Sequence, residues 1–84
     1  MTLPLERLAP GGDAIVERLS VPAHDAEWLR AVGFFEGQRV RVLRRAPWGG
    51  PIHVRLGHDG EFAVDRTLAR EIDVRAQAVG NDDD

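Results

Sequence analysis

Apolar and polar side chains alternate in several short stretches of the chain, which predicts β-strands with one buried face. Two such strands are expected over Arg39–Leu43 and Ile52–Leu56, where valine, leucine and isoleucine alternate with arginine or histidine. Further strands are predicted at Asp13–Leu19, around Phe62–Val64 and over Ile72–Gln77. Because Asp13–Leu19 is half apolar on both faces, its register stays open.

Two other segments have helical spacing. An apolar residue recurs every three positions across Pro22–Val32, which predicts an amphipathic helix that ends at Gly33. Ser20 is the candidate for the N-cap of this helix. A single helical turn is predicted over Arg66–Glu71, with Asp65 as its cap.

Together these elements predict a mainly β fold, an SH3-like small barrel of about five short strands. One helix is inserted after the first strand, and the single helical turn precedes the last one. The domain is predicted over residues 1–79, and the acidic residues 80–84 are expected to form a disordered tail. The predicted core takes the apolar faces of these elements: Leu8, Val16, Leu29, Val32, Phe34, Val40, Val42, Ile52, Val54, Phe62, Leu68, Ile72 and Val74.

The composition restricts the function classes. With 84 residues and no cysteine, the chain is long enough for one small domain without disulfides or thiolate metal sites. We find no signal-peptide or membrane-spanning run, so a cytoplasmic protein is expected. No nucleophile elbow, phosphate-binding loop or dinucleotide fingerprint occurs, so neither catalysis nor a cofactor is expected.

Charge is unevenly distributed along the chain. The net charge is −3, yet residues 37–56 hold five arginines and no acid, namely Arg39, Arg41, Arg44, Arg45 and Arg55. Three interpretations stay open: a solvated strand face, a nucleic-acid-binding face, or a surface that binds an acidic protein. The second is disfavoured, because no aromatic residues are interleaved on these strands and both flanks are acidic.

Two histidines are the weak candidates for a metal site. His53 is predicted on a strand, and His58 lies in the hairpin turn predicted at residues 57–60. A zinc or iron site needs three or four converging ligands, and no neighbouring acid completes such a set by spacing. We therefore expect no metal.

The stretch APWGGPIHV, residues 46–54, places a large apolar side chain at a predicted turn. Pro47 and Pro51 bracket Trp48 and two glycines, which is a typical turn composition. Trp48 either folds back as a lid on the barrel or points outward as an anchor for a protein partner. In the second case Arg44 and Arg45 belong to the same partner-binding surface, since tryptophan and arginine are enriched at interface hot spots.

Three motifs in this order resemble the FeoA family of ferrous iron transport. They are Leu-x-x-Val-Gly-Phe-x-x-Gly over Leu29–Gly37, Arg-x-Ala-Pro-x-Gly-x-Pro-Ile-His-Val over Arg44–Val54, and Leu-Ala-x-x-Ile-x-Val over Leu68–Val74. The Leu-rich segment LERLAPGGD precedes them, and the resemblance covers roughly residues 3–79. Glu36 stands where the family often has proline.

This resemblance implies an SH3-like fold and a role in iron homeostasis without chemistry of its own. The implied partner is FeoB, a membrane permease with a cytosolic GTP-binding domain, so the protein would be peripheral to the membrane through that partner. The alternative is a small SH3-like module that binds nucleic acid or other proteins. Self-association stays open, because a small barrel can keep exposed edges.

Overall fold

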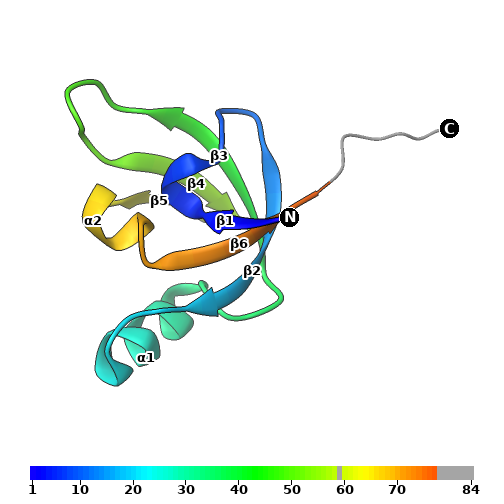
Figure 1. Ribbon diagram of the computed structural model, residues 1–84, viewed down its shortest axis with the longest axis vertical. Coiled ribbons are helices and arrows are strands. Elements are labelled where there is room, and N and C mark those ends of the chain that lie inside the picture. The colour runs from blue at the N-terminus through cyan, green and yellow to red at the C-terminus, as the bar shows by residue number, and fades with distance from the viewer. Residues whose placement is uncertain (59, 78–84) are drawn as a thin grey trace, which may run out of the picture.

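A computed structural model describes residues 1–58 and 60–77 and contains one antiparallel sheet of six strands (Figure 1). The strand order is β1-β6-β2-β3-β4-β5, so β1 and β5 form the two edges. The strands are β1 Thr2–Pro4, β2 Asp13–Leu19, β3 Arg39–Arg45, β4 Ile52–Leu56, β5 Gly60–Val64 and β6 Ile72–Ala76. The helices are the 3-10 turn η1 Leu5–Arg7, α1 Ala23–Val32 and α2 Arg66–Ala69. The predicted tail and Asp59 of the predicted turn lie outside the described residues.

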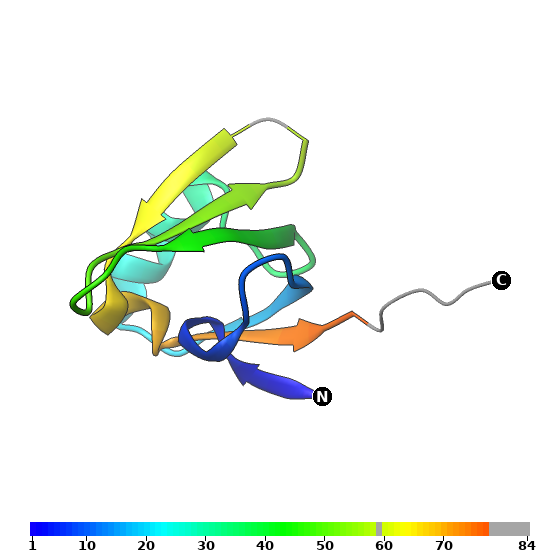
Figure 2. The ribbon, with the colours of Figure 1, turned by 90° about the horizontal axis from the view of Figure 1, so that it is seen from above.

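The fold class is confirmed: the protein is mainly β, and its strongly curled, open sheet is of the small-barrel type (Figure 2). The bounds predicted for β2 and β4 are confirmed. β1 was not expected, because a three-residue strand containing proline has no alternation of its own. It forms through pairing with β6, in which Leu3 lies opposite Val74.

Of the two predicted helix N-caps, one is confirmed and the other is wrong. Asp65 caps α2 as predicted, since its Oδ2 accepts a hydrogen bond from the backbone N–H of Thr67 at 3.1 Å. The candidate cap of α1 was wrong: Pro22 occupies the N-cap position without a side-chain bond, and the Ser20 hydroxyl instead lies 3.2 Å from Asp73 Oδ2. Gly33 ends α1 with φ of 122°, a backbone conformation that favours glycine.

Most of the predicted core is buried. Three of its members, Val32, Phe62 and Leu68, are only partly buried against it. The core also includes residues that the predicted core omitted: Leu5, Ala14, Leu19, Ala26, Leu56, Val64 and Ala69. Leu5 is fully buried although it belongs to η1, because this turn packs against α2 and β6.

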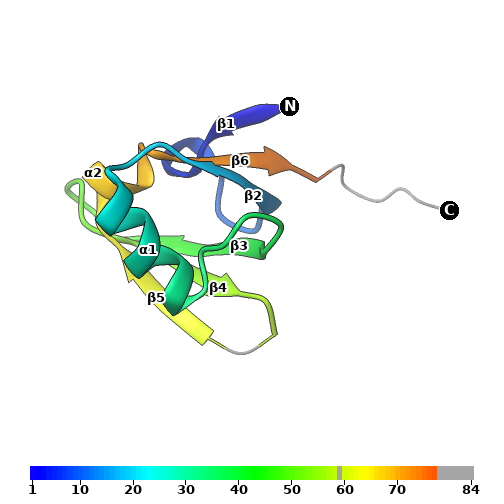
Figure 3. The same cartoon turned by 90° about the horizontal axis from the view of Figure 1, so that it is seen from below.

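Helix α1 lies beside β5 (Figure 3). Phe62 on β5 stacks on the buried Phe34 at a centroid distance of 6.0 Å and meets Trp28 on α1 at 6.3 Å. The ring of Phe62 therefore joins the helix to the edge strand. Among residues 1–58 and 60–77, no helix has the length and apolar character required to cross a membrane.

An irregularity in β3 changes which side chains face outward. The pairing between β3 and β4 shifts by one residue between Val42 and Arg44. As a result Arg44 lies opposite His53 on the outer face, whereas Arg45 lies opposite the buried Ile52. Alternation continued from Val40 and Val42 would place Arg44 inward and Arg45 outward, the reverse of what the structure shows.

Candidate partner-binding loop

The loop between β3 and β4, residues 46–51, is closed as a tight hairpin turn, and we call it the Trp48 loop. The N–H of Ala46 donates to the carbonyl of Pro51 at 3.0 Å, and the N–H of Gly50 donates to the carbonyl of Pro47 at 3.1 Å. Trp48 and Gly49 are the two central residues, with φ of 63° and 73°. Hairpin turns with positive φ at both central positions normally carry asparagine, aspartate or glycine there. A tryptophan at this position is therefore unusual.

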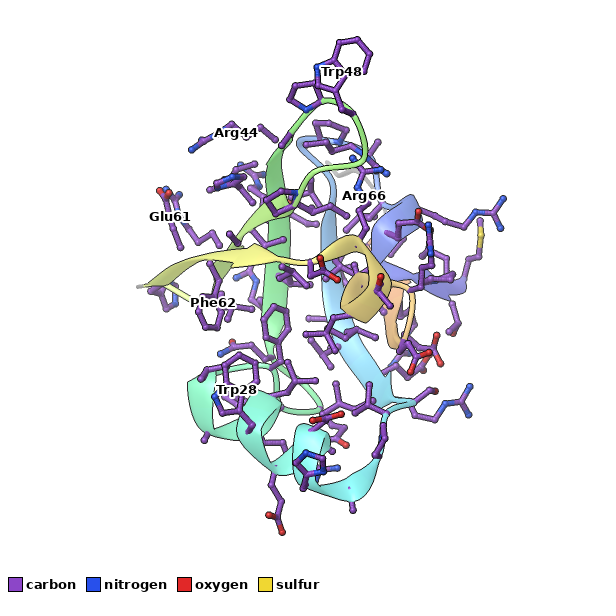
Figure 4. The ribbon with its side chains drawn as sticks, turned by 90° about the vertical axis from the view of Figure 1, so that its left-hand side faces the viewer. Trp28, Arg44, Trp48, Glu61, Phe62 and Arg66 are labelled. Atoms are coloured by element: carbon purple, nitrogen blue, oxygen red, sulfur yellow. The ribbon has the colours of Figure 1, made fainter. Side chains whose placement is uncertain are left out.

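Trp48 projects away from the rest of the protein (Figure 4). Its side chain is 99% exposed, whereas Trp28, the other tryptophan, is 55% exposed and contacts Phe62. The ring of Trp48 does not cover the core, so the structure does not support the lid interpretation. The exposed indole buries almost no apolar surface, and its backbone is in a strained conformation. Neither feature of Trp48 stabilises the folded protein.

The Trp48 loop is braced from below by α2. Arg66 Nε donates to the carbonyl oxygen of Gly50 at 2.9 Å, and its Nη2 donates to that of Ala46 at 3.2 Å. Arg66 is partly buried, so these charge-assisted bonds are partly protected from water. Sequence reasoning missed this residue, because no local pattern links a helical turn to a loop located sixteen to twenty positions earlier.

The two arginines that precede the loop have different surroundings. Arg45 is partly buried, and its Nη1 donates to the carbonyl oxygen of Leu8 at 3.1 Å. Arg44 is exposed on the outer face and makes no hydrogen bond or ion pair with the described residues. Of the predicted pair, Arg44 is therefore available beside Trp48, whereas Arg45 already holds the end of β3 against the N-terminal segment.

Two other arginines of the basic stretch are engaged in ion pairs. Arg41 forms a two-pronged pair with Asp13, with both N–O distances at 2.9 Å, and Arg55 pairs with Glu61 at 3.3 Å. The guanidinium of Arg41 lowers the pKa of the Asp13 carboxyl mainly through this hydrogen bond. A solvated strand face with cross-strand pairs thus accounts for part of the basic stretch.

The candidate metal ligands are not gathered into a site. His53 is partly buried on β4 opposite Arg44 and Ala63, and His58 is exposed in the turn before β5. Within the described part of the chain, no group of three or more histidine, aspartate or glutamate side chains is placed to hold a metal ion.

The fold and the braced loop define a small SH3-like domain that presents a protruding tryptophan and contains, among its described residues, no gathered metal site. The sequence profile of the FeoA domain matches residues 3–76. The chain therefore belongs to the FeoA family. No curated protein matches it significantly.

Solved structures agree with this assignment. The crystal structure of an iron uptake regulatory protein, FeoA, shares 30% identity and superposes with a TM-score of 0.79, covering 92% of this chain and 99% of that one. FeoA of Stenotrophomonas maltophilia, solved as a zinc complex and described as a prokaryotic SH3-domain protein, shares 32% identity with 88% of both chains covered and a TM-score of 0.70. The FeoA protein of Chlorobium tepidum shares 28% identity and reaches a TM-score of 0.83, with 94% of this chain and 74% of that one covered.

Proposed function

We propose that this protein is a non-catalytic, cytoplasmic accessory protein of ferrous iron uptake that binds a FeoB-type permease through the Trp48 loop. Family membership supports the link to ferrous iron transport. The observation that carries the loop assignment is Trp48 itself, 99% exposed at a positive φ. The partner is the cytosolic part of the permease, which carries a GTP-binding domain.

The Trp48 loop is suited to act as an anchor because it is already ordered. Pro47 and Pro51 restrict the backbone, and Arg66 holds the carbonyl groups on both sides of the turn. Little conformational entropy is then lost when the indole ring enters a pocket of the partner. A buried tryptophan at the centre of an interface typically contributes several kcal/mol when it is truncated to alanine.

Arg44 supplies the electrostatic part of the proposal. It lies exposed at the end of β3 beside the loop (Figure 4), and it has no acidic partner among residues 1–58 and 60–77. An acidic surface around the partner's pocket would be attracted to it before contact. Charges at the rim of an interface mainly raise the association rate, and salt screens this effect.

The experiment is a binding titration against the purified cytosolic domain of the permease from the same organism. Trp48→Ala should raise the Kd by roughly 30- to 1,000-fold, which corresponds to about 2–4 kcal/mol. Arg44→Ala should chiefly slow association, most strongly at low salt. Trp28→Ala removes a tryptophan from another surface and is the matched control, with binding normalised to the folded fraction.

Fluorescence gives a second readout on the same complex. A Trp28→Phe variant retains Trp48 alone, so its emission should be that of a water-exposed indole and should shift to the blue when the permease domain is added. A Trp48→Phe variant retains Trp28 alone and should change little. Unchanged emission of Trp48 in a formed complex, or equal affinity of wild type and Trp48→Ala, would show that the Trp48 loop does not bind the permease.

A further inference from the structure

Four charged residues form a row across the outer face of the sheet, one from each of four neighbouring strands. In register order they are Asp13 on β2, Arg41 on β3, Arg55 on β4 and Glu61 on β5. Residues directly opposite each other on antiparallel strands have neighbouring side chains. The row therefore places two arginines side by side in the centre and one carboxylate at each end.

Each of the two central guanidinium groups is bound to the acid on its outer side. Arg41 uses Nε and Nη2 to bind Asp13, and Arg55 uses Nη2 to bind Glu61. Each arginine has five N–H donors. Nη1 of Arg41 makes no hydrogen bond with the described residues. The same holds for Nε and Nη1 of Arg55. Like charges directly opposite destabilise a strand pair, and an anion between them would relieve that repulsion.

An open depression lies on this face, and three arginines contribute to it. Its lining side chains include Arg39, Arg41, Arg55 and His58, and the one acid among the lining residues is Asp13. Arg39 and His58 form no ion pair within residues 1–58 and 60–77. The protein as a whole is acidic, with a net charge of −3, so this face is a local exception.

We propose that this depression binds one small oxyanion of the phosphate type, held by Arg39, Arg41, Arg55 and His58. Guanidinium groups bind such oxyanions through paired, charge-assisted hydrogen bonds. The site is separate from the Trp48 loop, so it is a further binding activity that does not depend on the proposed partner. We call it the oxyanion depression.

Two observations favour a compact anion over a nucleic acid. The depression has a volume of about 280 Å³, just below the roughly 300–1,000 Å³ of typical small-molecule sites. The carboxylates of Asp13 and Glu61 close both ends of the row, so a polyanion running across the sheet would meet like charge. No aromatic side chain lines the depression to stack a base.

The test is a titration of the isotope-labelled full chain with inorganic phosphate, with ionic strength held constant by chloride. Backbone amide signals of residues 39–41 and 55–58 and the arginine Nε–H signals report binding by NMR. Saturable shifts confined to these residues are expected, and Arg39→Gln should weaken the affinity by roughly tenfold. Arg75→Gln is the matched control, since it removes the same charge from an exposed arginine on β6.

A variant that is expected to bind phosphate more tightly gives a second test of the site. Asp13→Asn removes the negative charge that lines the depression and leaves one acceptor oxygen in place of two, so one of the two bound N–H groups of Arg41 becomes free. It should tighten phosphate binding by roughly threefold to tenfold. Shifts that grow linearly with phosphate, or equal losses in Arg39→Gln and Arg75→Gln, would overturn the site.

The same titration with a short single-stranded oligonucleotide in place of phosphate tests whether this face binds nucleic acid instead of a small anion. We expect it to bind no more tightly than phosphate does. Binding more than about 100-fold tighter, with a steep salt dependence, would assign the face to nucleic acid instead and overturn the small-anion assignment.

Discussion

Arg66 on α2 donates a 2.9 Å hydrogen bond to the backbone carbonyl of Gly50, the residue that closes the Trp48 turn. A second bond from the same guanidinium reaches Ala46 on the other side of the turn at 3.2 Å. One side chain thus holds both ends of a loop whose own apex is in a strained conformation. The exposed indole at that apex is presented by a supported backbone, not by a flexible one.

Removing this brace should loosen the loop and weaken the fold. Arg66→Ala leaves two partly buried carbonyl groups without their donors, so we expect a loss of about 1–3 kcal/mol in the free energy of unfolding. Urea denaturation measures this loss. Arg70→Ala, which removes an exposed arginine paired with Glu6 at 3.4 Å, should cost less than about 1 kcal/mol. Equal losses in both variants would mean that Arg66 contributes only as a surface charge.

Replacing Trp48 should reveal a conflict between stability and binding. Asparagine tolerates the left-handed backbone of this turn better than tryptophan does, and it exposes no apolar surface. Trp48→Asn should therefore raise the free energy of unfolding by roughly 0.5–1 kcal/mol while it weakens binding to the permease domain about as much as Trp48→Ala does. Thermal unfolding and the binding titration test the two halves separately. A less stable Trp48→Asn protein would show that the indole has contacts in the folded state.

The core assignments predict the largest losses of stability. Leu29 and Ile52 are fully buried, so truncation of either to alanine should cost about 2–5 kcal/mol. Leu68 is only partly buried at the edge of the core, so Leu68→Ala should cost clearly less. Denaturant unfolding curves of the three variants provide the comparison. Losses under about 1 kcal/mol at both buried sites would contradict the assigned faces.

Glu36 makes stability depend on acid pH. Arg30, which binds the Glu36 carboxylate through two bonds of 3.1 and 2.9 Å, lowers the pKa of Glu36 from 4.5 to about 2. A lowered pKa in the folded state means that this contribution is complete above pH 4.5 and is lost as pH falls towards 2. Because both side chains are exposed, the loss should be small and should shrink at high salt.

Thermal midpoints measured between pH 6 and pH 2 test this dependence. Glu36→Gln should flatten the decline across the window, whereas Glu71→Gln, an exposed acid without an ion pair among the described residues, should not. An identical decline in wild type and Glu36→Gln would assign the acid sensitivity to other carboxylates, with Asp13 the next candidate, since Arg41 lowers its pKa as well.

Local pattern was sufficient for much of the architecture. Period-two alternation located β4 with its bounds, and the isoleucine, valine and leucine content located β2 with its bounds although its register stayed open. Three-residue spacing located α1, and Asp65 located the start of α2. These signals are readable because each depends on backbone geometry within a few residues. The turn chemistry of residues 46–51 likewise predicted a loop that carries Trp48.

Tertiary structure decided which side chains lie beside the Trp48 loop. The irregularity in β3 sends Arg44 outward and Arg45 towards Leu8, and the curl of the sheet brings Arg66 beneath the Trp48 loop. The row from Asp13 to Glu61 also exists only through strand register, since its members are separated by up to 48 positions along the chain. Such contacts form when distant segments pack together, so no local periodicity encodes them. The sequence alone therefore determined the family, the main elements and the turn, whereas packing decided how the tryptophan and the arginines are presented.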